Sequence, residues 1–290
     1  MAAQLALILA CVYAYAAVVT LAMGGSRSTR IAVAIVSSLA LAAPIVAGDR
    51  LEPFARGALA LGVVMVFGRT AQLAADREPV PAGRRFLHAI AVPDMRHVAR
   101  IRPSLARPEL VRVLAFGLIG ALAMTLLVHV PLPTIARWIV GGVFAYVTLD
   151  AFVALVIVIW RGAGFDVTRA SIHDDPLLSR TVVEFWGRRW NRVVGSLLRS
   201  FFFMPFARRG RPWLGIAAAF AASTLLHVYL AWIVVGARGA LLWGIFFAAQ
   251  LPIVWLERRA KLAGRAWTIG VFVLLSPLFV DPFLAVVGVR

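Results

Sequence analysis

Long apolar stretches separated by short basic segments dominate the pattern of this chain. About eight stretches reach the roughly 20 mainly apolar residues that a bilayer core of about 30 Å requires of a spanning helix. They lie near residues 3–23, 31–48, 54–70, 110–130, 134–160, 212–235, 239–256 and 266–286. The third is shortened by Arg56, and the seventh is interrupted by Gln250 and Pro252. The pattern predicts an all-α polytopic membrane protein in which 1–290 form a single membrane domain.

Composition supports this class. Hydrophobic residues make up 62% of the chain, against about 45 to 50% in a soluble domain. Cys11 is the only cysteine, which excludes an intramolecular disulfide and any metal cluster built from cysteines. The apolar run continues past Cys11 to Met23, so the first span is predicted to remain uncleaved.

The net charge of +17 is distributed unevenly along the chain. With eight spans and an outside N-terminus, 25 of the 30 Lys and Arg residues fall in predicted cytoplasmic loops, near 24–30, 69–112, 161–211 and 257–265. This asymmetry follows the positive-inside rule. The charge therefore indicates a multi-pass membrane topology, in the inner membrane if the chain is bacterial, rather than a nucleic-acid partner.

The first large basic segment covers residues 71–109. Its arginines alternate with apolar side chains, and five prolines break it into short pieces. An interrupted amphipathic strip of this kind is typical of a membrane surface with anionic headgroups. A share in binding an anionic cofactor is the alternative.

The second segment, residues 161–211, contains a predicted helix. Thr181 and Glu184 have the spacing of a capping box, so the helix is predicted to begin there and to end at Pro205. Apolar residues recur at intervals of three and four, while Arg188, Arg192 and Arg199 share another face. Tryptophans and arginines in such a helix are also ordinary interfacial anchors.

The contiguous heptapeptide Phe185-Trp186-Gly187-Arg188-Arg189-Trp190-Asn191 is more specific than its single residues. It resembles the hallmark of the wax synthase branch of the membrane-bound O-acyltransferases. In that family the block precedes a spanning helix that carries an intramembrane histidine, and here His227 follows Asn191 by 36 residues. The similarity covers about 175–232. One departure is Val228, where family members often have an acidic residue.

The resemblance implies transfer of a fatty acyl group from an acyl thioester to a lipophilic alcohol, giving a wax ester or a related neutral lipid. His227 would be the general base, and burial should keep its imidazole uncharged at neutral pH. Asn191 would be the second catalytic residue. An intramembrane cavity open to the cytoplasm is predicted to bring the two together. The candidate substrate-binding residues are Trp186, Arg188, Arg189, Trp190, Arg192, Ser223 and Asp150.

These roles set the expected ligands. Arg188, Arg189 and Arg192 have planar donors suited to the phosphates of coenzyme A, although membrane anchoring explains them equally well. Acyl-CoA is expected as a co-substrate, with no permanently bound cofactor. The other expected partners are the bilayer and the alcohol. No metal is expected, because His173, Asp174 and Asp175 are adjacent in a loop and have poor ligand geometry.

Other readings stay open at this point. Asp150 is an ionisable residue within an apolar span, and it either orients His227, binds an acceptor hydroxyl or bonds to a neighbouring helix. Gln250 and Asp281 are predicted helix-packing contacts. A transporter or channel with Asp150 and His227 along a polar pathway is the alternative function, and a catalytically inactive scaffold is another.

Overall fold

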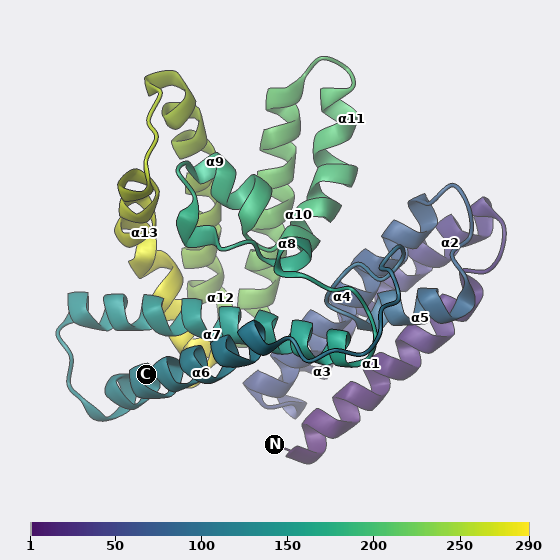
Figure 1. Cartoon of the computed structure of the whole chain (residues 1–290), viewed down its shortest axis with the longest axis horizontal. Coiled ribbons are helices and arrows are strands. Elements are labelled where there is room, and N and C mark those ends of the chain that lie inside the picture. The colour runs from purple at the N-terminus through teal and green to yellow at the C-terminus, as the bar shows by residue number, and fades with distance from the viewer. Residues whose placement is uncertain (1, 290) are drawn as a thin grey trace. The chain divides into compact units, whose positions relative to one another are not determined.

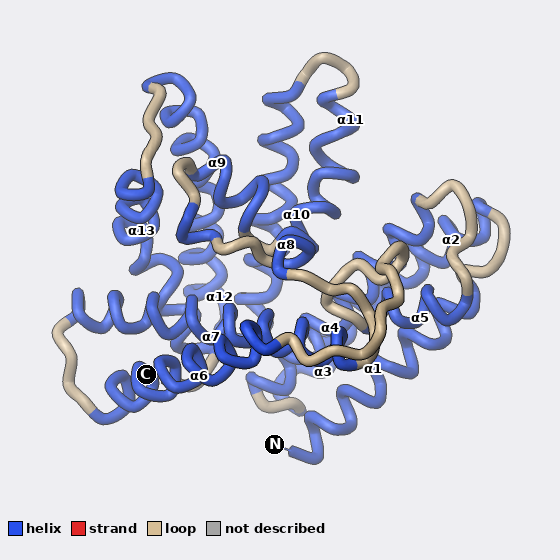
Figure 2. The backbone as a smooth tube through the Cα atoms, viewed as in Figure 1, coloured by secondary structure: helices blue, strands red, loops and turns tan. Residues whose placement is uncertain are grey.

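The computed structural model describes residues 2–289, which form helices joined by loops, the longest of them between Ile90 and Arg107 (Figures 1 and 2). Within these residues no sheet forms, and Arg100 and Phe165 make a single isolated bridge. Seven helical segments are long and apolar enough to cross a membrane. The predicted all-α polytopic membrane fold is confirmed.

The seven segments coincide with the eight predicted stretches. They are α1 (Ala2–Ala22), residues Arg27–Arg50, α4 (Pro53–Ala75), α6 (Arg107–His129), α7 (Thr134–Gly162), α12 (Pro212–Ala260) and α13 (Arg265–Val286). The sixth contains two predicted stretches, because Gly236 interrupts its helical backbone with φ 78° and ψ −169°. Only glycine adopts such a conformation at little cost, so α12 turns there and has two arms.

The shorter elements complete the chain. Residues 27–50 consist of α2 (Arg27–Ser37), η1 (Ser38–Ala42), α3 (Ala43–Ala47) and η2 (Gly48–Arg50), and α5 spans Ala82–Ile90. Between the spans α7 and α12 lie α8 (Arg169–Ile172), η3 (Pro176–Leu178), α9 (Val182–Glu184), η4 (Phe185–Arg189), α10 (Arg192–Leu198), η5 (Arg199–Phe203) and α11 (Met204–Ala207). Contacts group the chain into two compact units. One comprises the residues up to His97 with Trp232–Gly236, and the other comprises the rest.

In the first unit, α5 packs against both α1 and α4. Ala89 of α5 belongs to an apolar cluster with Val12 and Val66. Arg85 of α5 is buried, and its Nε and Nη1 donate to the carbonyl oxygens of Thr20 and Val80, both at 2.8 Å. Residues 82–90 are therefore packed inside the first unit. A segment that only lay on the membrane surface would not bury Arg85 in this way.

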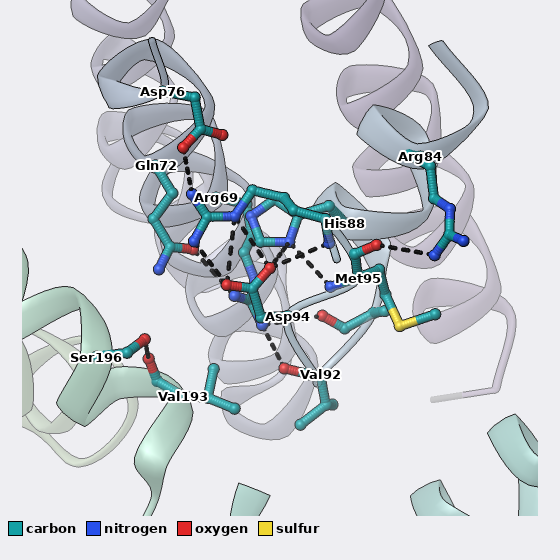
Figure 3. A network of polar contacts seen from close by, with 12 residues as sticks. Arg69, Gln72, Asp76, Arg84, His88, Val92, Asp94, Met95, Val193 and Ser196 are labelled. Carbon is teal, nitrogen blue, oxygen red and sulfur yellow. Dashed lines mark hydrogen bonds and ion pairs between the residues drawn. The ribbon is translucent and has the colours of Figure 1, made fainter. Parts of the chain in front are cut away.

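A partly buried polar network joins α4, α5 and the following loop (Figure 3). Asp94 receives hydrogen bonds from Arg96, and its Oδ1 lies 3.2 Å from Nδ1 of the fully buried His88. Arg96 also reaches Asp76 at 2.8 Å. Burial lowers the pKa of His88 to about 4. Burial alone would raise the pKa of Asp94, but the bonds from His88 and Arg96 outweigh it and hold that pKa well below its usual range.

Acid should therefore destabilise this unit in two stages. The folded protein keeps His88 uncharged down to about pH 4, whereas the unfolded chain protonates it below its ordinary pKa of 6.5. The unfolded state then binds more protons, so stability falls between about pH 6.5 and 4, and protonation of Asp94 in the unfolded chain continues the loss below that. We expect the detergent-solubilised protein to show a falling melting temperature over this range.

The control for this prediction is a second histidine. His88→Gln should flatten the melting temperature between pH 6.5 and 4. His129→Gln, at an exposed position, should leave the pH dependence as it is in the wild type. Equal pH dependence in the wild type and in the His88 variant would contradict the assignment.

In the second unit, close helix contacts occur where side chains are small. A Cβ at Gly141 of α7 would lie 2.5 Å from Val280 of α13, so glycine permits that approach. The predicted packing residue Asp281 accepts a hydrogen bond from Nε1 of Trp138 at 3.0 Å, which also links α13 to α7. Val182 of α9, Val254 of α12 and Val271 of α13 form a further buried cluster. This cluster fixes the short helix α9 against two spans.

Candidate active site

The heptapeptide forms a bent segment rather than part of one long helix. Thr181 caps α9 by accepting from the Glu184 backbone N–H at 3.0 Å, as predicted. The other half of the capping box is displaced by one residue, because Glu184 accepts from the Arg180 N–H instead. After the π-helical turn η4, Trp190 is extended and Asn191 is left-handed, with φ 37°.

The predicted continuous helix is therefore wrong at Trp190 and Asn191. Asparagine tolerates left-handed backbone, and its side-chain oxygen caps α10 by accepting from the Val194 N–H at 3.2 Å. The predicted end at Pro205 is also wrong, because Pro205 lies in the first turn of α11. Proline is tolerated there because the first turn leaves its backbone nitrogen without a helical acceptor.

A buried carboxylate holds the start of this segment. Glu257, 3% exposed near the end of α12, accepts from the backbone N–H groups of Val182 and Val183 at 2.6 and 3.3 Å. It also accepts from Nε1 of Trp267 at 3.0 Å. A negative charge at a helix N-terminus satisfies its free N–H groups. Glu257 was not predicted as a site residue, and its only signal in the sequence is a lone acid beside Arg258 and Arg259.

His227 lies half-buried on the first arm of α12. Its Nδ1 is 2.7 Å from the carbonyl oxygen of Ser223, one turn earlier. A carbonyl can only accept, so Nδ1 carries the proton and the lone pair of a neutral ring is on Nε2. The ring stacks on Phe247 of the second arm, with centroids 3.6 Å apart, and Trp243 lies at 6.0 Å. The arrangement presents a basic nitrogen in an aromatic environment.

Trp186 of the heptapeptide approaches the same aromatic group. Its ring centroid lies 5.7 Å from that of Phe247, and its Nε1 donates to Oε1 of the buried Gln250 at 3.0 Å. Gln250 in turn donates to the Phe246 carbonyl. The rings of Trp186 and His227 therefore both contact the ring of Phe247. Gln250, predicted as a contact between spanning helices, bonds the heptapeptide to the span beside His227.

Asn191 is placed differently from the expectation. It is exposed, its side chain caps α10, and no contact among the described residues joins it to His227. The connection between the heptapeptide and His227 passes through Trp186 and Phe247. The cavity predicted to bring Asn191 and His227 together stays a prediction.

The arginines of the heptapeptide line an open hollow of about 360 Å³. The lining residues are Asp174, Glu184, Gly187, Arg188, Arg189 and Arg192. Arg189 is engaged, because its Nε donates to Glu184 at 2.7 Å and its Nη1 donates to the Asp174 carbonyl at 3.0 Å. The backbone N–H of Arg180 and the ion pair with Arg189 hold the pKa of Glu184 below its usual value.

Arg188 and Arg192 remain available in this hollow. Both side chains are exposed. Nη1 of Arg192 makes only a long contact of 4.0 Å with Oδ2 of Asp174, and no ion pair of Arg188 occurs among the described residues. Arginine donors with free capacity suit phosphate oxygens, which favours these two over Arg189 as ligands of an anion.

Asp150 is fully buried in α7 and lies among cations. Arg169 makes a short contact with its Oδ1, and Arg112 lies 3.6 Å from Oδ2. Nε2 of His173 is 3.8 Å from Oδ1, and burial lowers the pKa of His173 to about 4. Among the alternatives for Asp150, these contacts favour bonding to neighbouring segments rather than orientation of His227.

Residues 173–175 connect this charge cluster to the heptapeptide. The ring of His173 meets that of Trp190 edge-on at 4.8 Å, and the Asp174 N–H donates to the Arg189 carbonyl at 2.9 Å. Asp175 pairs with Arg112 at 2.9 Å. Trp190 also stacks on Phe185. Asp150 thus supports the end of the heptapeptide through this loop.

Part of the chain is similar to a known protein family. Residues 170–248 match the Membrane bound O-acyl transferase family, and this range includes the heptapeptide, His227 and Phe247. The resemblance to the wax synthase branch is confirmed over this part of the chain.

Two plant proteins from Arabidopsis thaliana are similar over shorter stretches. The first, "Probable long-chain-alcohol O-fatty-acyltransferase 2", is 41% identical over 54 residues, which cover 19% of this chain and 16% of the plant protein. The second, "Probable long-chain-alcohol O-fatty-acyltransferase 1", is 33% identical over 67 residues, which cover 20% of each. The aligned stretches thus span about a fifth or less of these relatives.

Proposed function

We infer that this chain, a member of the membrane bound O-acyl transferase family through residues 170–248, transfers a fatty acyl group from acyl-CoA to the hydroxyl of a lipophilic alcohol. The product would be a wax ester or a related neutral lipid. The observation that carries the proposal is the 2.7 Å contact between Nδ1 of His227 and the carbonyl oxygen of Ser223. The Ser223 carbonyl holds the proton on Nδ1, so Nε2 is a free base next to the aromatic group that Trp186 contacts.

The proposed reaction uses this nitrogen twice. Nε2 of His227 takes the proton of the alcohol while the alcohol oxygen attacks the thioester carbonyl carbon. The C–O bond forms, the C–S bond breaks, and the imidazolium returns its proton to the departing thiolate, which leaves as the free thiol. General-base catalysis of this kind contributes about 10² to 10⁴ in rate.

The hollow at Arg188 and Arg192 suits the donor. Coenzyme A carries phosphates, and these exposed guanidinium groups line a space of about 360 Å³ on the segment that bears Trp186. Asn191, one residue from Arg192, would help to orient a substrate once the site is loaded. Acyl-CoA is thus a co-substrate in this proposal, and no permanently bound cofactor is invoked.

The proposed topology follows the charge distribution. The loops that carry most arginines would face the cytoplasm with the N-terminus outside, so the donor hollow would open toward soluble acyl-CoA. In a bacterium the location would be the inner membrane. The partners would be the bilayer and the two substrates, without nucleic acid.

The test of the function is ester formation by membranes that contain the protein. Labelled acyl-CoA would be supplied with long-chain alcohols, sterols or diacylglycerol in separate reactions. We expect a labelled ester with at least one alcohol, above the level of membranes lacking the protein. Failure of every acceptor with several acyl chain lengths, in correctly inserted protein, would contradict the proposal.

The donor site makes a separate prediction. Arg188→Ala with Arg192→Ala should raise the apparent KM for acyl-CoA by about tenfold or more, because a charged hydrogen bond contributes about 1.5 to 3 kcal/mol. The alcohol KM should change little. Arg238→Ala, an exposed arginine in the turn of α12, is the matched control.

Arg189→Ala separates binding from structure. Because Arg189 holds Glu184 and the Asp174 carbonyl, its loss should lower the melting temperature of the protein.

An unchanged KM for acyl-CoA in the Arg188/Arg192 double variant would assign these arginines to membrane anchoring.

A further inference from the structure

Seven cationic side chains gather at one end of the second unit, and we call this surface the basic rim. Three lie in the turn after α11, and four lie around the turn between α12 and α13. They are Arg208, Arg209, Arg211, Arg258, Arg259, Lys261 and Arg265. All seven are exposed, and none has an ion-pair partner among residues 2–289.

The two groups belong to one surface. Both turns reach the same end of the second unit, at the top of Figure 1, because α12 returns on itself at Gly236. The guanidinium carbon of Arg258 lies 5.0 Å from the centre of the Trp213 ring, and Trp213 follows the turn with Arg211. A cation–π contact at this distance joins the start of α12 to its end.

The charge of the rim is not neutralised by the chain. Between residues 199 and 265 the sequence contains a single acid, Glu257. That carboxylate is 3% exposed and is engaged by backbone N–H groups at the start of α9. The nearby Glu184 is paired with Arg189. No acidic side chain of the described residues therefore neutralises the positive charge of the basic rim, which is exposed to its surroundings.

Aromatic side chains are interleaved with these cations. Phe201, Phe202, Trp213 and Trp255 are exposed, and the guanidinium of Arg259 lies 5.9 Å from the Trp255 ring. The hairpin of η5, α11 and α12 is held close, since a Cβ at Gly215 would lie 2.7 Å from the Phe203 carbonyl oxygen. Arginine beside tryptophan near the ends of a spanning helix, with phenylalanine in the short segment before it, is the composition of a membrane–water interface.

We propose that the basic rim binds the headgroups of anionic phospholipids. The phosphates would pair with the arginines, while the aromatic rings lie at the depth of the glycerol backbone. The alternative partner, an acidic soluble protein, does not account for the exposed Trp213 and Trp255 near the ends of the membrane-spanning helix α12. This site is independent of the proposed acyl transfer, because it uses none of the residues assigned to the reaction.

The test uses the full chain in detergent, titrated separately with dioleoyl phosphatidylglycerol and dioleoyl phosphatidylcholine. Native mass spectrometry would count the bound lipids and give the apparent affinity for the first. We expect phosphatidylglycerol to bind more tightly. Each basic residue near a headgroup surface contributes about 1 kcal/mol, or roughly fivefold in affinity. Arg208→Gln, Arg209→Gln and Arg211→Gln together should remove most of that preference.

Two further variants make the outcome decisive. The same three positions changed to lysine keep the charge and should retain the preference. Arg50→Gln, Arg137→Gln and Arg238→Gln remove three cations outside the basic rim and should also retain it. Equal affinity for the two lipids in the wild type, or an unchanged preference in the rim glutamine variant, would overturn the proposal. Saturable binding of an acidic carrier protein in place of lipid would overturn it as well.

Discussion

Replacing His227 with alanine is expected to abolish measurable ester formation while the protein stays folded and inserted. The variant loses the proton acceptor at Nε2, and removal of a general base costs about 10² to 10⁴ in rate. It also removes the hydrogen bond to the Ser223 carbonyl and the stacking on Phe247. Both contacts lie within α12, so their loss should leave the packing between different helices in place. Turnover of labelled acyl-CoA by purified protein would measure the effect.

A second histidine variant controls for this result. His129→Ala changes an exposed histidine at the end of α6 and should leave turnover unchanged. Equal melting temperatures for the His227 variant and the wild type would exclude unfolding as the cause. Full turnover in folded His227→Ala would disprove the role of His227 as the base.

Replacing Asp150 with alanine should have the largest effect on stability. The carboxylate is fully buried and pairs with Arg169, whose side chain is only 12% exposed, so its removal breaks a buried ion pair, although Glu109 stays 3.0 Å from Arg169. Breaking a buried pair in this way costs about 3 to 5 kcal/mol. Thermal unfolding in detergent should show a large fall in melting temperature, and ester formation should fall with it as the loop under Trp190 loosens.

Matched variants separate charge from volume. Asp150→Asn keeps an oxygen acceptor for Arg169 and should destabilise the protein less than alanine does. Asp166→Ala removes a partly exposed acid that pairs with Arg161 at 2.8 Å, and surface pairs contribute only about 0 to 1 kcal/mol. Similar melting temperatures for Asp150→Ala and Asp166→Ala would show that Asp150 does not stabilise the loop.

The fold class could be predicted because the bilayer imposes a simple rule on composition. A spanning helix must satisfy its own backbone groups and present apolar side chains along its length. The predicted stretches therefore matched α1, residues 27–50, α4, α6, α7, both arms of α12, and α13. The predicted stretches 212–235 and 239–256 leave Gly236 between them, and its positive φ in the structure is the turn of α12.

Local structure within the heptapeptide was predicted less well. The apolar spacing from Val183 to Phe201 favours a continuous helix, yet the backbone breaks at Asn191. Periodicity reports which face is apolar, whereas the break depends on partners that are distant in sequence. Glu257 fixes the start of α9 from 75 residues away, and Asp174 holds the Arg189 backbone.

The same distinction between local sequence pattern and contacts that are distant in sequence applies to the candidate site. The sequence by itself determined the membrane class and the family resemblance, and it named His227 and Asn191 as candidate catalytic residues, because hydropathy and a contiguous motif are local properties. Only the tertiary structure decided that Phe247 contacts both His227 and Trp186, that Gln250 binds Trp186, and that Asp150 supports residues 173–175 instead of His227. These contacts depend on how α12 turns and on which helix faces meet, and side-chain packing between remote segments leaves no periodic signal in one sequence.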